Sequence, residues 1–407
     1  MERCDALVIG GGAAGSVAAL KLARAGLRTV LVERSARIGG STTPKIDITQ
    51  DTGIHPFAKE LGIPLEWHSR KSRWLSRNSS FSLKSRIIDL FIRRGPGKGS
   101  LESSLLKKAA GAGCEIRTST NVRALNPSLS SKGGVAGLES GRKRELVSAR
   151  YIISADGSAS RFAHSCIAPP GAQDRAVFQG FGVLAEGMRI EPETTHVFFD
   201  PKLAPGGYFY ICADKNGKGV AAIATEPRQS GGKPADWHFK RFVENNTVAN
   251  GALKGMRRAK CFMGSCSAGK CRSHHYKNML FTGDAGRLLD PLLGYGLNHA
   301  IRSGYYAAEA IISNMGERTS DVSHAYEERL AKEILPELRN GERARRVFNA
   351  FSNSDFDTLV ELVHEVSKDA NLDDFFDDPL GHPSEIARAV LAKPGTFLLL
   401  RHLRRVL

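Results

Sequence analysis

A glycine-rich turn near the amino terminus constrains the fold of this chain more than any other feature. Residues 10–15 read GGGAAG, which fits the pattern GxGxxG, and they follow a short apolar run at residues 6–9. A helical pattern comes next and stops at Gly26, and a second apolar run at residues 29–32 ends in Glu33. A buried strand, a glycine turn, a helix and a second buried strand, in this order, form the unit that binds a dinucleotide in parallel sheets.

Each part of this unit has a physical role. Gly10 allows the tight turn, Gly12 lets the backbone approach a pyrophosphate, and Gly15 lets the helix pack closely against the strand. The helical pattern after the turn contains Val17, Leu20, Leu22 and Ala23. Its N-terminus offers N–H groups and a partial positive charge to phosphates. We therefore predict that the pyrophosphate of a dinucleotide lies over these residues.

The end of the second strand indicates which dinucleotides fit. Glu33, followed by Arg34, stands 18 residues after Gly15. A carboxylate at this position can accept hydrogen bonds from ribose hydroxyls. It favours a ribose diol and disfavours the 2′-phosphate of NADP. The fingerprint alone does not choose between NAD and FAD.

Two later motifs favour FAD. An apolar run at residues 151–155 is followed by Asp-Gly at 156–157, and another at 279–281 leads into Gly-Asp at 283–284. A carboxylate after the latter strand can hold a ribityl hydroxyl. The segment at 291–298 then reads PLLGYGLN and precedes a helical pattern. It can bring bare backbone against a flat ring, while the N-terminus of the helix stabilises negative charge on the reduced ring.

These motifs, in this order, resemble FAD-dependent oxidoreductases of the para-hydroxybenzoate hydroxylase fold, and among them the geranylgeranyl reductase family. The resemblance covers about residues 4–320. It implies that Arg94 meets the ribose or pyrophosphate and that the backbone of Val122 meets the adenine. The cofactor-binding residues predicted from the motifs and the resemblance are Gly10, Gly12, Ala13, Ala14, Gly15, Glu33, Arg34, Arg94, Val122, Asp156, Gly157, Gly283, Asp284, Pro291, Gly294, Gly296, Leu297 and Asn298.

Two segments depart from the pattern of that family. Those reductases carry Tyr-x-Trp-x-Phe-Pro-Lys and then Gly-x-Gly, whereas residues 208–219 of this chain read YFYICADKNGKG. Many members place a cysteine after the second strand, but residues 37–45 contain none. We take Lys45, Tyr208 and Tyr210 as candidates for lining a flavin and substrate cavity, although Lys45 also fits an ordinary surface charge. The sequence identifies no catalytic residue and no proton donor.

The predicted fold is α/β, with a Rossmann-like FAD-binding domain, a second domain built on an antiparallel sheet, and a helical C-terminal region. Alternating polar and apolar residues in the middle of the chain favour the antiparallel sheet. The predicted FAD-binding domain combines residues 1–55, 90–165 and 275–320. The substrate domain combines residues 56–89 and 170–260, and the helical region spans residues 321–407.

The charge of the chain indicates an anionic partner. Its net charge is +16 and its pI is about 9.6. Such a balance suits nucleic acid, a membrane surface or a phosphorylated ligand. The sequence lacks a basic and aromatic recognition motif, which argues against nucleic acid. Residues 397–407 are apolar and basic together, so they fit either a helix on an anionic membrane or a packed terminal helix.

Seven cysteines are scattered along the chain. An odd count without a secretion signal favours reduced thiols and a cytoplasmic protein. Cys261, Cys266 and Cys271 stand five residues apart, with His274 and His275 close behind. This spacing is looser than that of zinc sites. We therefore predict no metal and interpret these residues as reduced cysteines, with a redox thiol pair as the alternative.

The resemblance implies a reductase that uses FAD to reduce carbon–carbon double bonds of prenyl lipids. The electron donor stays open between NAD(P)H and a ferredoxin, because the sequence contains no second dinucleotide fingerprint. A flavin monooxygenase that hydroxylates aromatic substrates is the alternative enzyme. A basic protein that binds a membrane or nucleic-acid surface through a vestigial flavin fold is the alternative from another class.

Overall fold

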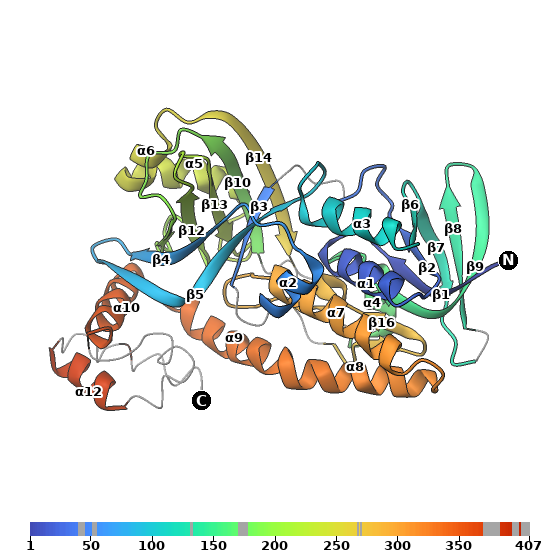
Figure 1. The fold of residues 1–407 in the computed structure, drawn as a ribbon. Helices are drawn as coiled ribbons and strands as arrows, with labels where there is room; N and C mark the ends of the chain where they lie inside the picture. Colours follow the sequence, from blue (N-terminus) through green and yellow to red (C-terminus); the bar gives the residue numbers. More distant parts are fainter. Residues whose placement is uncertain are drawn as a thin grey trace.

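The structure is a computed structural model of the chain, and Figure 1 shows its fold. It contains two sheets that lie side by side, with long helices along one side of both (Figure 1). The residues that the structure describes are 1–39, 45–50, 55–130, 133–169, 178–266, 268, 271–368, 383–392 and 399.

The first sheet contains the predicted nucleotide-binding unit. Its order is β15 (His275–Tyr276), β16 (Met279–Phe281), β9 (Lys143–Ser154), β1 (Glu2–Ile9), β2 (Thr29–Val32) and β6 (Glu115–Arg117). From β16 to β6 all neighbouring strands are parallel. The antiparallel strands β7 (Asn121–Asn126) and β8 (Gly134–Ser140) extend the sheet from β9.

Helices cover the first sheet because its strands are apolar on both faces. One core contains residues of α1 (Ala13–Arg24), α3 (Leu101–Gly111) and α7 (Leu297–Ser313) packed on the strands. The opposite face packs against α4 (Arg161–Cys166). A Cβ at Gly304 of α7 would lie 2.3 Å from the carbonyl oxygen of Ala14. This glycine therefore allows α7 to approach the start of α1 closely.

The second sheet is mostly antiparallel. Its order is β14 (Arg257–Cys266), β10 (Phe178–Glu186), β13 (Gly219–Thr225), β12 (Tyr208–Ala213), β11 (Thr194–Phe198), β4 (Trp67–Leu75), β5 (Ser80–Arg94) and β3 (Lys45–Gln50). The strands β11 and β4 are the parallel pair. Residues of α5 (Ala235–Asn245) and α6 (Thr247–Leu253) join its core. Other helices in the described residues are α2 (His55–Leu61), α8 (Thr319–Glu333), α9 (Leu335–Phe348), α10 (Asn353–Val366) and α12 (Pro383–Ala392).

The predicted fold class is confirmed. The chain combines an FAD-binding α/β part, a second and mostly antiparallel sheet, and helices toward the carboxyl terminus. One strand differs from the predicted division, because β3 pairs with β5 in the second sheet and not with the first. Its position follows from backbone pairing between distant segments, which the local pattern does not reveal. The domain boundaries otherwise stay a prediction.

Within the described part of the chain, no helix is both long enough and apolar enough to cross a membrane. The basic and apolar segment 397–407 lies outside the described residues except for residue 399. The two interpretations of this segment therefore stay predictions.

An ion pair connects α8 to the segment that leads into β15. His274 Nδ1 lies 3.2 Å from Glu327 Oε2 of α8, and both groups are largely shielded from solvent. Burial alone would lower the pKa of His274, but its hydrogen bonds to Cys271 and Glu327 raise that pKa to about 9. Burial alone would raise the pKa of Glu327, but His274 lowers it to about 2.

This pair predicts a window of pH in which it stabilises the fold. The histidine contribution is complete below its unfolded pKa of 6.5 and is lost as pH rises toward 9. The glutamate contribution is complete above its unfolded pKa of 4.5 and is lost as pH falls toward 2. We expect Glu327→Gln to lower the free energy of unfolding by roughly 1–3 kcal/mol between those two unfolded values. Denaturant titrations should show this difference shrinking as pH rises from 6.5 toward 9. A pH-independent difference would contradict the prediction.

Candidate functional site

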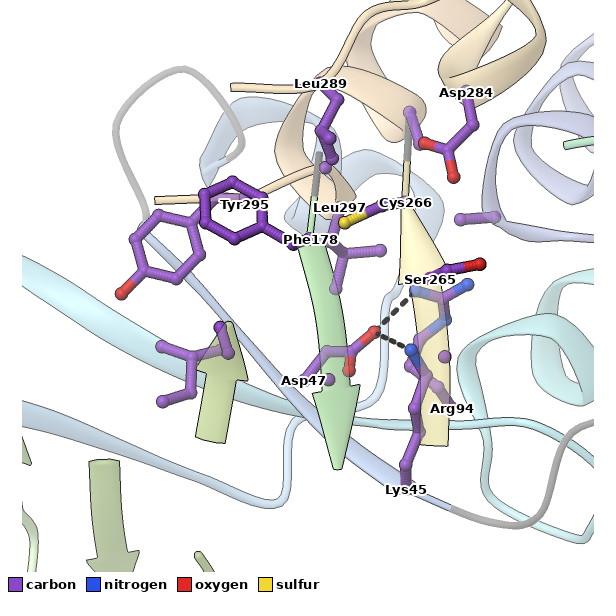
Figure 2. A pocket seen from close by; sticks show the side chains of 18 of the residues that line it. Lys45, Asp47, Arg94, Phe178, Ser265, Cys266, Asp284, Leu289, Tyr295 and Leu297 are labelled. Atoms are coloured by element: carbon purple, nitrogen blue, oxygen red, sulfur yellow. Dashed lines mark hydrogen bonds and ion pairs between the residues drawn. The ribbon is translucent and has the colours of Figure 1, made fainter. Parts of the chain in front are cut away.

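A cavity of about 380 Å³ lies where the two sheets meet. The start of α1, the turn η1 (Gly283–Gly286), the loop before α7 and the start of α7 form one side of it. Strands β3, β10, β12, β13 and β14 of the second sheet form the other side. Figure 2 shows side chains that line it, among them Asp47, Cys266, Asp284 and Tyr295.

The glycine turn brings bare backbone to this cavity. Gly10 has a φ of +101°, and a Cβ at Gly15 would lie 1.9 Å from the Gly10 carbonyl oxygen, so both positions need glycine for the chain to pack. Gly12 differs, because no atom lies within 4 Å of where its Cβ would be. It lines the cavity together with Ala13 and Ala14.

The N-terminus of α1 suits an anionic group. Its N-cap residue is Gly12, and it has neither a side-chain cap nor an acidic residue in its first turn. Its first N–H groups and its partial positive charge are thus directed at the cavity. The helix α7 also begins without a side-chain cap, at Gly296 on the cavity wall. These two helix ends fit the pyrophosphate and the ring of a flavin dinucleotide.

Glu33 supports the glycine turn from behind. Its carboxylate accepts one hydrogen bond from the N–H of Gly11 and one from the N–H of Ser35, each at 2.8 Å. The side chain is buried and does not line the cavity. The contact of Glu33 with a ribose, which its position after β2 predicts, stays a prediction.

Because Glu33 satisfies two backbone donors, its removal should loosen the turn. We expect Glu33→Ala to lower the free energy of unfolding by about 2–3 kcal/mol, since it leaves buried N–H groups without an acceptor. The exposed Glu328 on α8 provides the control, and Glu328→Ala should change stability by less than about 0.5 kcal/mol. Denaturant titrations of the proteins stripped of cofactor measure both changes, and equal effects would contradict this role.

A cluster of half-buried charges and one buried carboxylate, that of Glu102, lies at the wall of the cavity. Asp47 Oδ2 lies 3.0 Å from Lys45 Nζ and 3.0 Å from Arg94 Nη1, and Figure 2 draws both ion pairs. Glu102 Oε1 lies 2.5 Å from Nε of Arg94. Burial opposes ionisation of Asp47, but Lys45 and Arg94 lower its pKa. Arg94 is therefore held between two carboxylates, and it lines the cavity from that position.

Asp284 also lies on the cavity wall, after β16. Burial raises the pKa of this carboxyl, while the nearby Lys45 and Arg94 act to lower it. The positive side chains of Lys45 and Arg94 thus favour the ionised carboxylate of Asp284, against the effect of burial. The arrangement agrees with the predicted contact between Asp284 and a flavin ribityl chain, which stays a proposal.

The opposite wall is aromatic. The hydroxyl of Tyr208 donates to the carbonyl oxygen of Leu293 at 2.7 Å, and the ring centroids of Tyr208 and Tyr210 are 6.2 Å apart. Burial raises the pKa of both phenols well above the ordinary value, and it also raises the pKa of Tyr295. These groups are therefore uncharged at neutral pH and present aromatic rings to the cavity.

The cavity also contains Cys266, which the spacing of the cysteines did not assign to the flavin site. Cys266 ends β14, opposite Phe178 of β10, and both residues line the cavity (Figure 2). Burial raises the pKa of the Cys266 thiol to about 12, so it carries its proton at neutral pH. The family pattern places a cysteine in a different segment, after the second strand, where residues 37–45 of this chain contain none. Only the pairing of β10 with β14 brings this one to the cavity.

The predicted site residues divide into two groups. The first group lines the cavity and comprises Gly12, Ala13, Ala14, Lys45, Arg94, Gly157, Tyr208, Tyr210, Gly283, Asp284, Gly294, Gly296 and Leu297. The second group lies outside the cavity lining and comprises Gly10, Gly15, Glu33, Arg34, Val122, Asp156, Pro291 and Asn298.

Val122 and Asp156 of the second group contact other residues of the chain. The carbonyl oxygen of Val122 accepts a hydrogen bond from Arg161. Asp156 accepts one from the Ser154 hydroxyl at 2.6 Å, and burial raises the pKa of its carboxyl. The roles of both residues toward a cofactor stay predictions.

Comparison with known proteins identifies the class. Residues 3–333 match the FAD binding domain family, so this chain belongs to that family and FAD is its cofactor. It is an FAD-dependent oxidoreductase related to geranylgeranyl reductases, which confirms the resemblance that the motifs indicate.

Named relatives support this relationship. Digeranylgeranylglycerophospholipid reductase 2 of Methanopyrus kandleri is 26% identical over 374 residues, which cover 88% of this chain and 90% of that protein. Digeranylgeranylglycerophospholipid reductase of Methanospirillum hungatei is 28% identical over 393 residues, which cover 91% of each.

Solved structures share the fold. A geranylgeranyl bacteriochlorophyll reductase-like protein from Thermoplasma acidophilum has a TM-score of 0.76 at 21% identity, with 100% of both chains covered. A probable FAD-dependent monooxygenase from Pseudomonas aeruginosa has a TM-score of 0.66 at 17% identity, covering 88% of this chain and 99% of that one. These likenesses establish the fold and leave the reaction open.

Proposed function

We propose that this protein reduces carbon–carbon double bonds in the geranylgeranyl chains of a prenyl lipid. The observation that carries the proposal is the cavity itself, in which bare helix ends on one side face an aromatic and apolar wall on the other. Reduced FAD supplies a hydride to an alkene carbon. The wall of Tyr208, Tyr210 and their neighbours binds an apolar chain and excludes water from it.

The second alkene carbon requires a proton from the protein or from solvent. We propose Cys266 as the proton source, because its thiol is protonated and lines the cavity. This assignment supplies the donor for which the sequence offered no candidate. Asp47 and Glu102 balance the charges of Lys45 and Arg94 on the same wall. In this proposal the two cationic side chains offer N–H donors to the cofactor.

The names of the relatives support the substrate class. Two of them are called digeranylgeranylglycerophospholipid reductases, a name that describes a phospholipid with geranylgeranyl chains. The net charge of +16 agrees with a phosphorylated lipid or an anionic bilayer as the partner. We propose that the protein works at such a surface inside the cell.

Anaerobic reoxidation tests the proposed reaction. The purified flavoprotein is reduced with dithionite without oxygen and mixed with geranylgeranyl phospholipid dispersed in detergent. We expect the oxidised flavin spectrum to return and the lipid mass to rise by two hydrogens per reduced bond. The fully saturated lipid is the control and should leave the flavin reduced. Failure of the unsaturated lipid to reoxidise the flavin would contradict the proposal.

The same preparation separates the alternatives. Oxygen uptake that depends on an aromatic substrate would support a monooxygenase instead. If the protein neither purifies with FAD nor takes it up, that result would support the alternative of a vestigial flavin fold that binds a membrane or nucleic-acid surface. Reduction of the flavin by NADH, by NADPH or by a reduced ferredoxin, each tested alone, identifies the electron donor.

A further inference from the structure

A second group of chemically active side chains lies outside the cavity. Cys271 and His274 belong to the segment that leads into β15, and Glu327 belongs to α8. His274 Nε2 lies 3.2 Å from Cys271 Sγ, and His274 Nδ1 lies 3.2 Å from Glu327 Oε2. The three groups thus form a line of thiol, imidazole and carboxylate, and none of them belongs to the cavity lining.

The surrounding bonds fix the orientation of the imidazole. Glu327 accepts hydrogen bonds from the hydroxyl of Ser273, at 2.7 Å, and from the N–H of His274. The His274 carbonyl oxygen accepts from the N–H of Phe281 at 2.8 Å. The imidazole is itself buried, at 6% exposure. Because Glu327 holds Nδ1, the other ring nitrogen faces the sulfur of Cys271.

The charges favour a reactive sulfur. Although burial opposes it, the bonds to Cys271 and Glu327 raise the pKa of His274 to about 9, so the imidazole is protonated at neutral pH. Glu327 is ionised there, since His274 lowers its pKa to about 2 against the effect of burial. An imidazolium next to a sulfur stabilises the thiolate, which is the nucleophilic form of cysteine.

Other cysteines of the chain lie in different environments. Burial raises the pKa values of the Cys4, Cys114, Cys212 and Cys266 thiols to between about 11 and about 12, which keeps them protonated. Cys261 is exposed on β14, whereas Cys271 is half-buried. Accessibility alone would therefore make Cys261 the more reactive of these two, and the imidazole would reverse that order.

We propose that Cys271 is an activated nucleophile and a modification site for small-molecule disulfides. The Cys271 thiolate attacks one sulfur of the disulfide and forms a new S–S bond. The original S–S bond breaks, and the second sulfur leaves as a thiolate. The exchange conserves electrons, because Cys271 is oxidised as the departing thiol is reduced. His274 and Glu327 act as positioning residues in this site.

Competitive labelling of the native holoprotein tests the proposal. The protein is treated at pH 7 with limiting iodoacetamide or with oxidised glutathione, and each cysteine is quantified by peptide mass spectrometry. We expect Cys271 to react at least ten times faster than the exposed Cys261 and to form a mixed disulfide that dithiothreitol reverses. A rate at Cys271 equal to or below that of Cys261 would overturn the proposal, and this comparison needs no variant.

Two variants test the role of the imidazole. His274→Gln should lower the labelling rate of Cys271 at least tenfold while the rate of Cys261 stays unchanged. The neighbouring His275 is the matched control, and His275→Gln should leave both rates as they are. A general loosening of the fold would instead accelerate the buried cysteines. Retention of the fast rate at Cys271 in His274→Gln would show that the imidazole does not activate the thiol.

Discussion

Replacing Gly12 with glutamate is expected to weaken FAD binding at least about 100-fold while leaving the fold intact. A hundredfold loss corresponds to about 2.7 kcal/mol of binding free energy. The backbone of Gly12 is extended, with a φ of −77°, and no atom lies within 4 Å of its missing Cβ. A side chain therefore fits without strain, but it projects into the cavity at the N-terminus of α1. A carboxylate there would occupy the position of the pyrophosphate and repel it.

The measurement is FAD titration of the apoprotein, followed by flavin fluorescence. Gly251 on α6 is a matched control, because it is exposed and also has open space at its Cβ position. Gly251→Glu should bind FAD as the unmodified protein does. The unfolding midpoints of the two apoproteins should agree with that of the original chain. FAD affinity unchanged by Gly12→Glu would show that the pyrophosphate does not lie at this turn.

The contrast between Gly12 and Gly15 shows what the sequence could predict. The GxGxxG pattern correctly predicts a turn between a strand and a helix, because the requirement for glycine is local. It does not distinguish Gly12, which faces open space, from Gly15, whose Cβ would collide with the Gly10 carbonyl oxygen. The fold class and FAD follow from such local motifs in their order along the chain.

The wall of the cavity depends instead on contacts between distant segments. Arg94 meets Asp47 because β3 pairs with β5, in the register Lys45 to Arg94. Cys266 reaches the cavity because β14 pairs with β10. The spacing of the cysteines along the chain predicts only that Cys266 and Cys271 are reduced thiols, without a role in the site. Phe178, which pairs with Cys266, lies on another strand, and Glu327, which orients His274 beside Cys271, lies on α8. The local pattern around the cysteines contains His274 but neither of these two distant partners.

Replacing Cys266 with alanine is expected to lower the rate of prenyl-lipid reduction by about 100-fold. A positioned general acid typically contributes 10²–10⁴-fold. The Cys266 thiol lines the cavity, and it is protonated near neutrality because burial raises its pKa to about 12. So high a pKa makes the thiol a weak acid, which places the expected loss at the low end of that range. Alanine removes the S–H group and leaves the apolar wall around it. Binding of FAD and its anaerobic reduction by dithionite should stay unchanged.

The conservative variants distinguish a proton donor from a packing residue. Cys266→Ser restores an O–H group of similar size and should recover part of the rate that Cys266→Ala loses. Cys261→Ala, on the same strand but exposed, should leave the rate unchanged. Full activity of Cys266→Ala with bound FAD would exclude Cys266 as the proton source while leaving the reductase itself intact. Absence of lipid reduction by the unmodified protein would instead contradict the proposed reaction, so the two failures are distinguishable.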